Sequence, residues 1–313
     1  MNMSYKEAIS IVIPVYNGEN SIANLVTDLI DRLSISYSLE IVLVNDCSPD
    51  NSEAVCLSIF EKHKSIVKFL SLSKNVGEHN AVMAGLNQVT GNFTVIMDDD
   101  FQNPVMEVVK LIEFAIVSKH DVIYTYYDKK EHSFFRNLGS RFNDKVATIL
   151  LKKPKDLYLS SFKIMNKFLV KEIIKYDLPF PYIDGLILRT TNSIGKLEVR
   201  HDKRINGASN YTLKKLVSLW MNMFTNFSIL PLRFSMIVGF VFSLFGFGYG
   251  LFAVIEKLFN PHLPIGYTAL IVLVSVFSGI QLMALGMVGE YLGRMFMSQN
   301  KKPQYSIRKL YTI

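Results

Sequence analysis

The chain has 313 residues, of which 50% are hydrophobic and 19% are charged. It is long enough for one large or two ordinary domains, and this composition excludes a mainly disordered protein. Two cysteines exclude a disulfide framework. The formal net charge of +7 predicts a negatively charged partner, either a nucleic acid or an anionic membrane surface, and the distribution of apolar residues must decide between them.

The first part of the chain alternates short apolar runs with segments of helical spacing. We expect buried strands at residues 9–13, 40–44, 67–72, 93–97 and 122–126, and helices at residues 19–34, 50–62, 78–89 and 104–117. This alternation predicts an α/β domain with a mostly parallel sheet.

The second part of the chain contains two long uncharged stretches. Residues 234–255 carry no charge and would reach about 33 Å as a helix, enough to cross a hydrocarbon core of about 30 Å. A second stretch predicts a spanning helix over 266–288. The alternative is a pair of buried helices in a soluble protein. Basic residues flank the pair, so the positive-inside rule predicts that both long ends lie in the cytoplasm.

These patterns divide the chain into four parts. We expect a cytoplasmic domain over 1–195, a juxtamembrane segment over 196–232, two transmembrane helices within 233–289 and a basic cytoplasmic tail over 290–313. Residues 134–151 and 211–229 have the spacing of amphipathic helices that lie on a membrane surface. The alternative for both is an ordinary helix packed on the sheet.

Polar side chains follow four of the predicted strands, where ligands gather in parallel sheets. They are Pro14, Tyr16, Asn17 and Glu19; Asn45, Asp46 and Ser48; Lys74 and Asn75; and Asp98, Asp99, Asp100 and Gln102. Four such clusters in succession predict a nucleotide pocket. Asp46 is suited to accept hydrogen bonds from a base or a ribose, or else to form a turn before a helix.

The run of three aspartates is the most informative motif. Neighbouring carboxylates repel each other, so a fold keeps them together against a compensating cation. Asp98 and Asp100 point the same way on an extended segment, and their hard oxygen ligands suit Mg²⁺ or Mn²⁺ bridged to a diphosphate. The alternative is a solvated acidic turn that caps the helix beginning near Pro104.

Several motifs resemble a known family. Pro14-Val-Tyr-Asn17, Val44-Asn-Asp-Cys-Ser48 and Asp98-Asp-Asp-Phe-Gln-Asn-Pro104 resemble family-2 glycosyltransferases of the GT-A fold. The motifs at 204–211, 230–233 and 288–294 resemble the polyprenyl-phosphate glycosyltransferases. That group includes dolichyl-phosphate mannose synthases and bacterial undecaprenyl-phosphate glucosyl and aminoarabinose transferases.

The resemblance implies roles for individual residues. It implies that Asp98, Asp100 and Gln102 surround the metal, and that Asp98, Asp100 and Arg204 are catalytic. Donor-binding residues would be Pro14, Tyr16, Asn17, Glu19, Asp46, Lys74, Asp98 and Asp99. Residues near the acceptor phosphate would be Arg136, Ser140, Arg141, Arg204 and Ser209. Guanidinium groups suit phosphate, although arginines on an interfacial helix also extend to the membrane surface without a ligand.

The chain departs from the family pattern at five positions. Gly18 stands where glutamate is frequent, Asp99 where alanine is common, and Lys163 where arginine is expected. Asn45 and Cys47 replace aspartate and glycine.

The resemblance implies an enzyme that transfers a sugar from a nucleoside-diphosphate sugar, with UDP the expected carrier, to undecaprenyl phosphate by metal-dependent inverting displacement. It also implies a bacterial inner-membrane location, a lipid bilayer as partner, a homotetramer and no nucleic-acid partner. The alternatives are a glycosyltransferase with another lipid or glycan acceptor, and a catalytically inactive membrane scaffold. The sugar itself is not readable from the sequence.

Overall fold

The computed structural model describes residues 6–127, 148, 153–154, 156–200, 230–259, 266–300 and 302–312. These residues belong to two compact units. One unit comprises residues 1–211 together with 302–313, and the other comprises residues 212–301.

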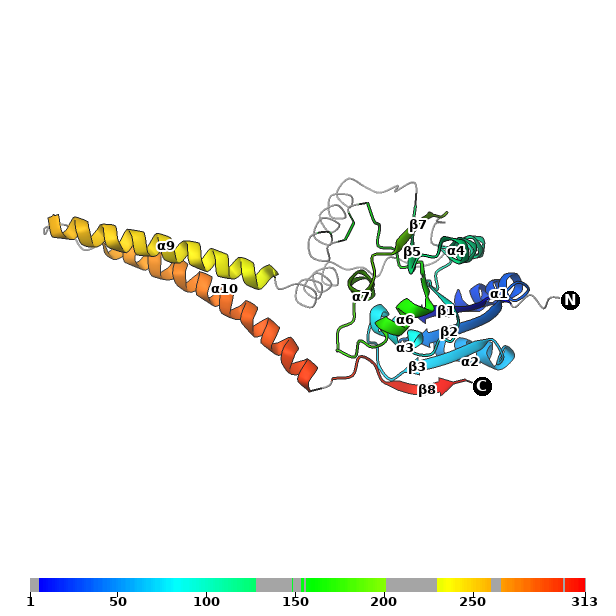
Figure 1. Ribbon diagram of the computed structural model, residues 1–313. Coiled ribbons are helices and arrows are strands. Elements are labelled where there is room, and N and C mark those ends of the chain that lie inside the picture. Colours follow the sequence, from blue (N-terminus) through cyan, green and yellow to red (C-terminus); the bar gives the residue numbers. More distant parts are fainter. Residues whose placement is uncertain are drawn as a thin grey trace. The chain divides into compact units, whose positions relative to one another are not determined.

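The first unit is built on a sheet whose eight described strands follow the order β7-β5-β6-β4-β1-β2-β3-β8 (Figure 1). The strands are β1 (Ala8–Val15), β2 (Ser38–Asn45), β3 (Val67–Leu72), β4 (Phe93–Ile96), β5 (Val122–Tyr126), β6 (Lys163–Asn166), β7 (Ile194–Glu198) and β8 (Ile307–Tyr311). The helices of this unit are α1 (Ile22–Leu33), α2 (Ser52–Lys62), α3 (Glu78–Leu86), α4 (Val105–Ser118), α6 (Lys167–Ile173) and α7 (Ile183–Thr190).

The centre of the sheet is parallel, which confirms the predicted fold class. Strand β1 pairs in parallel with β2 on one side and with β4 on the other, and β2 pairs in parallel with β3. The chain therefore builds outward from β1 through β2 and β3, and then crosses to β4. Ligands of open α/β sheets bind beside the carboxyl ends of strands at such a switch point, which here lies between β1 and β4.

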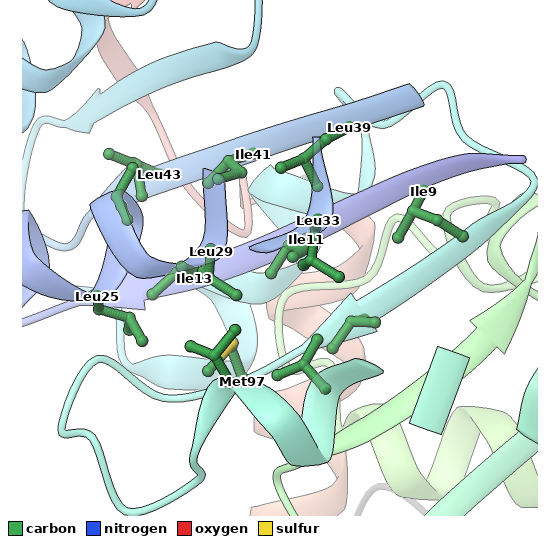
Figure 2. Packing of buried hydrophobic residues seen from close by; sticks show 14 of the residues in the cluster. Ile9, Ile11, Ile13, Leu25, Leu29, Leu33, Leu39, Ile41, Leu43 and Met97 are labelled. Atoms are coloured by element: carbon green, nitrogen blue, oxygen red, sulfur yellow. The ribbon is translucent and has the colours of Figure 1, made fainter. Parts of the chain in front are cut away.

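Helices cover both faces of the central strands. Leu25, Leu29 and Leu33 of α1 recur at the spacing of one helix face and lie in the same buried layer as Ile11 and Ile13 of β1 (Figure 2). Alternate residues of a strand point to the opposite face. On that face, a Cβ added to Gly85 of α3 would meet Val12 at 2.4 Å, so glycine permits close packing of α3 on β1.

The sheet also contains strands that the sequence analysis did not predict. Strand β6 is antiparallel to both β4 and β5. Strand β8 comes from the predicted C-terminal tail and pairs antiparallel with β3 at the edge of the sheet (Figure 1). The Tyr311 ring stacks on Phe69 with ring centroids 5.5 Å apart, and Gln304 donates hydrogen bonds to the carbonyl oxygens of Tyr176 and Leu178.

The described residues of the second unit form α9 (Leu230–Phe259) and α10 (Tyr267–Gln299). Both are long and apolar enough to cross a membrane, over Phe234–Phe252 and Val276–Gln299. Phe242 and Phe277 meet edge to face across the two helices, with centroids 6.3 Å apart. The predicted interfacial helices at 134–151 and 211–229 lie outside the described residues, apart from Thr148.

Candidate active site

Four loops meet the carboxyl edge of the parallel strands, and each contains a residue with positive φ. Asn17 follows β1 (φ 60°), Cys47 follows β2 (φ 53°), Gly77 follows β3 (φ 87°), and Phe101 follows β4 (φ 60°). Residues other than glycine seldom adopt this conformation, and such residues concentrate at functional sites. The backbone therefore singles out the same edge that the polar clusters predicted.

Asp98 follows β4 and contacts a residue that lies far along the sequence, just before β6. Because β6 runs antiparallel to β4, the residues just before β6 lie beside the carboxyl end of β4. There Ser161 Oγ donates a hydrogen bond of 2.7 Å to Asp98 Oδ2. Ser161 thus fixes one carboxylate oxygen of the predicted catalytic residue.

A buried ion pair lies next to this contact. Lys163 pairs with Asp184 of α7, and both side chains are almost fully buried. The Tyr124 hydroxyl donates to the same Asp184 oxygen at 2.8 Å, and the Lys163 ammonium lies 4.9 Å from the centre of the Tyr124 ring. Buried charges are tolerated when they are paired and hydrogen-bonded in this way.

Burial and like charges raise the pKa values of two aspartates. Burial is the main reason that the pKa of Asp98 rises to about 7, and the charge of Glu78 adds to it, while Ser161 and Lys163 lower it. Burial, followed by the charges of Asp98 and Asp100, raises the pKa of Asp99 to about 7. The site holds more negative charge than Lys163 neutralises.

This excess of carboxylates fits a divalent cation. Asp100 accepts a hydrogen bond of 3.2 Å from the main-chain N–H of Gln102, which fixes the turn that carries both. Within the described residues, no three His, Cys, Asp or Glu side chains converge in an arrangement that suits a metal ion. Two aspartates would therefore need further oxygen ligands, such as the phosphates of a donor.

The Asp46 carboxylate is hydrogen-bonded to the main chain of the loop after β3. Its two carboxylate oxygens accept hydrogen bonds from the main-chain N–H groups of Val76 and Gly77, at 2.8 and 2.9 Å. Burial raises its pKa, and these two hydrogen bonds oppose that rise. Asp46 therefore holds the loop after β3, a role that the sequence analysis did not assign to it.

The loop after β1 is held by the loop after β2. Glu19 Oε2 accepts from the main-chain N–H of Asn51 at 2.9 Å, next to the start of α2, and the Glu19 N–H donates to Asp50. The Asn17 N–H donates to Ser48 Oγ at 3.3 Å. These contacts give Glu19 a structural role beside its predicted part in donor binding.

The structure brings the other predicted donor residues to the same edge. Pro14 is in β1, Tyr16 follows it with 40% of its surface exposed, and Lys74 is exposed in the loop after β3. The predicted acceptor-phosphate residues Arg136, Ser140, Arg141, Arg204 and Ser209 all lie outside the described residues.

Three residues near the acidic loop were not expected from the sequence: Ser161, Asp184 and Tyr124. The signal for Ser161 was the motif Ser160-Ser-Phe-Lys163, in which only the lysine was noted. Asp184 and Tyr124 carry no local signal, because their contacts depend on the antiparallel insertion of β6 between β4 and β5.

Comparison with known proteins identifies the family. The model of glycosyl transferase family 2 matches residues 10–174, which include most of β1, all of β2 to β6 and the acidic loop. The chain belongs to glycosyl transferase family 2. It is therefore a glycosyltransferase, and its mixed sheet is the GT-A fold.

Similar proteins match this family-2 chain over nearly its whole length. It is 31% identical to an undecaprenyl-phosphate 4-deoxy-4-formamido-L-arabinose transferase of Aeromonas hydrophila, with 99% of this chain and 96% of the relative covered. The protein of the same name from Sodalis glossinidius is 30% identical, with 96% and 93% covered.

A solved structure of similar fold is glucosyl-3-phosphoglycerate synthase from Mycobacterium tuberculosis. It has a TM-score of 0.51 and 17% identity, and the match covers 69% of this chain and 79% of that one. The same enzyme in complex with Mn²⁺ and UDP-glucose has a TM-score of 0.50 and 17% identity, with 68% and 75% covered. At this identity the likeness establishes the fold.

Proposed function

We propose that this family-2 glycosyltransferase transfers a sugar from a UDP-sugar to undecaprenyl phosphate at the cytoplasmic face of a bacterial inner membrane. The observation that carries the proposal is the acidic loop, Asp98–Asp99–Asp100, at the switch point between β1 and β4. The names of the full-length relatives support the acceptor, and the UDP-glucose complex of a protein with the same fold supports the donor.

The proposed reaction is a displacement at the anomeric carbon of the donor sugar. A lipid phosphate is already ionised near neutral pH, so the reaction needs orientation and charge neutralisation more than a strong base. The new bond joins an acceptor phosphate oxygen to the anomeric carbon. The bond between that carbon and the donor's β-phosphate oxygen breaks, and UDP leaves with the bonding electrons.

Asp98, Asp100 and Gln102 would hold Mg²⁺ or Mn²⁺, which when bound stabilises the negative charge on the leaving diphosphate. Ser161 orients the Asp98 carboxylate, and Lys163 keeps a positive charge beside the acidic loop. Arg136, Arg141, Arg204, Ser140 and Ser209 are proposed to bind the acceptor phosphate.

The pairing of β8 with β3 supports the proposed topology. Strand β8 (Ile307–Tyr311) is part of the same sheet as β1, although two helices of membrane-spanning length lie between them in the sequence. A chain that crosses the membrane twice returns to its starting side, where β8 can join the catalytic unit. The positive-inside rule places that side in the cytoplasm. Assembly as a homotetramer is part of the same proposal, and light scattering in detergent tests it.

The test is a transfer assay with the purified chain in detergent. The acceptor is undecaprenyl phosphate, and the donors are radiolabelled UDP-glucose, UDP-4-deoxy-4-formamido-L-arabinose and further UDP-, GDP- and dTDP-sugars, each with Mg²⁺, Mn²⁺ or EDTA. A lipid-extractable product that EDTA abolishes would support the proposal and identify the donor. If the folded protein forms no lipid product from any donor, the acceptor assignment is wrong.

The variant Asp100→Asn tests the metal assignment. We expect turnover to fall at least about 100-fold, because the side chain keeps its shape but loses the charge that binds the cation. The unfolding temperature should stay close to that of the unchanged chain. Asp31→Asn, on the exposed face of α1, is the matched control and should keep full activity. Normal turnover of Asp100→Asn would refute the metal site.

A further inference from the structure

Two residues from neighbouring loops at the candidate site, Gly18 and Asp99, lie against each other. Gly18 stands in the loop after β1 and Asp99 in the acidic loop after β4. A Cβ added to Gly18 would lie 2.3 Å from Asp99 Oδ2 and 3.2 Å from Asp99 Cγ. Heavy atoms that are not bonded do not approach this closely, so the Asp99 carboxyl group fills the space that a side chain at position 18 would need.

The requirement for glycine at this position is steric. Gly77 is the one glycine in the described chain with positive φ, so the Gly18 backbone is open to other residues. Gly18 is nevertheless buried, and its surroundings leave no room for a side chain. The residue at 99 therefore decides what position 18 can carry.

Hydrogen bonds also fix the main chain of Gly18. Its N–H donates to Ser52 Oγ at 2.9 Å, and Ser52 is fully buried at the start of α2. Its carbonyl oxygen accepts from the N–H groups of Ser21 and Ile22, both at 3.1 Å, where α1 begins. The loop after β1 therefore rests on α1 and α2, and Asp99 closes the remaining side.

Asp99 itself has an uncommon environment. Its Oδ2 atom is buried and has no hydrogen-bond partner among the described residues. A carboxylate oxygen placed against a Cα atom gains nothing from hydrogen bonding there. The Asp99 carboxyl group also accepts a hydrogen bond from the main-chain N–H of Tyr16, so Asp99 connects the two loops by this bond and by the volume it fills between them.

We propose that Asp99 is a positioning residue that sets the spacing between the loop after β1 and the acidic loop. The first loop carries Tyr16, Asn17 and Glu19, and the second carries Asp98 and Asp100. If the proposed function holds, these loops bind opposite ends of the nucleotide donor, and the Gly18–Asp99 contact fixes the distance between their binding groups. Positions 18 and 99 are then one steric unit.

A double-mutant cycle tests this unit. Gly18→Ala forces the loops apart, so we expect its Kd for UDP with Mn²⁺ to rise at least about tenfold by calorimetry, while the KM for undecaprenyl phosphate stays within about twofold. Removal of the carboxyl group in Gly18→Ala/Asp99→Ala should recover at least about threefold in Kd. Recovery is partial because Val15 also lies 3.0 Å from the added Cβ and because Asp99→Ala removes the hydrogen bond from the Tyr16 main chain.

Two controls separate volume from charge and location. Gly18→Ala/Asp99→Asn keeps the volume at position 99 and should remain as weak as Gly18→Ala alone. Gly85→Ala introduces an equally close contact, 2.4 Å from Val12, on the opposite face of β1. Adding Asp99→Ala to Gly85→Ala should not raise its unfolding temperature. Adding Asp99→Ala to Gly18→Ala should restore part of the unfolding temperature that Gly18→Ala loses.

The outcomes distinguish this proposal from the proposed function. If UDP binds to none of the proteins, the donor assignment is wrong. The unfolding temperatures of the variants then still test whether positions 18 and 99 are coupled. The positioning proposal is overturned if Gly18→Ala is harmless, or if Asp99→Asn rescues it as well as Asp99→Ala. It is also overturned if the unfolding temperatures recover while the donor Kd does not.

Discussion

At the scale of single residues, strain is concentrated at the ends of the parallel strands. Cys47 and Phe101 hold positive φ angles with full side chains. A left-handed conformation costs about 1–2 kcal/mol for such residues. These strained residues lie where the loops turn sharply and place their polar groups at the carboxyl edge of the parallel strands.

Cys47 gives a direct test of that strain. We expect Cys47→Gly to raise the free energy of unfolding by up to about 1 kcal/mol, because glycine relieves the strained φ but gains entropy in the unfolded chain. Cys47→Ala keeps the strain and removes only the thiol, so it is the matched control and should show no gain. Equal unfolding temperatures for both variants would mean that the Cys47 backbone is not strained.

The raised pKa values of Asp98 and Asp99 predict how stability depends on pH. Both groups bind a proton more tightly in the folded state than in the unfolded state, where an aspartate has a pKa of about 4. Their contribution to stability is therefore complete below about pH 4 and is lost as the pH rises through about 7.

For the metal-free protein we expect the unfolding temperature to fall between pH 5.5 and pH 8. Asp99→Asn removes one of the titrating groups, so its temperature should fall less over the same range. Asp31→Asn on α1 should follow the unchanged chain. Mn²⁺ should restore stability at pH 8, because a cation compensates the ionised carboxylates. An Asp99→Asn profile parallel to that of the unchanged chain would contradict the assignment.

At the scale of elements, β8 completes the sheet at an edge that would otherwise be open. The Ser73 N–H donates to the Ser306 carbonyl at 2.8 Å, and Arg308 donates to the Ser73 carbonyl at 3.2 Å. Unpaired edge strands promote association between chains. β8 therefore protects β3 from pairing with other molecules.

The aromatic anchor of β8 can be removed by one substitution. Tyr311 packs on Phe69 and Phe60, with ring centroids 5.5 and 5.6 Å apart. We expect Tyr311→Ala to lower the free energy of unfolding by about 2–4 kcal/mol. Lys309→Ala loses only an exposed ion pair of 3.6 Å with Glu53 and should cost less than about 1 kcal/mol. Similar losses for the two variants, measured by thermal unfolding, would show that the rings do not anchor β8.

At the scale of the whole molecule, the sequence leaves the catalytic unit, passes through α9 and α10, and returns to it. The C-terminal strand therefore belongs to the catalytic unit, although the membrane-length helices separate it from the other strands.

This arrangement predicts how truncations behave. A chain that ends at residue 229 lacks β8 and exposes β3, so we expect it to aggregate. A chain in which a long Gly/Ser linker replaces residues 230–300 keeps β8 and should remain monodisperse in size-exclusion chromatography. A second control carries Tyr311→Ala in the linker form and should shift toward aggregation. Equal behaviour of the truncated and linked chains would contradict a protective role for β8.

Elements whose pattern is local could be predicted from the amino-acid sequence. Strands β1 to β5 and helices α1 to α4 lie where apolar runs and helical spacing predicted them, within a few residues. The two membrane-length helices were equally visible, because long uncharged stretches carry their signal within one segment. The acidic loop was found because its position after a buried strand indicates a ligand edge.

Which residues meet at that edge depends on how distant segments of the chain pack together. Ser161 reaches Asp98 because β6 inserts antiparallel beside β4, and β8 joins β3 after more than 200 intervening residues. The folded chain also directs the Asp46 carboxylate to the main-chain N–H groups of Val76 and Gly77, and it places Asp99 against Gly18. These contacts depend on strand order and close packing between distant segments. No local periodicity encodes them, so the sequence specified the chemistry and the fold specified its arrangement.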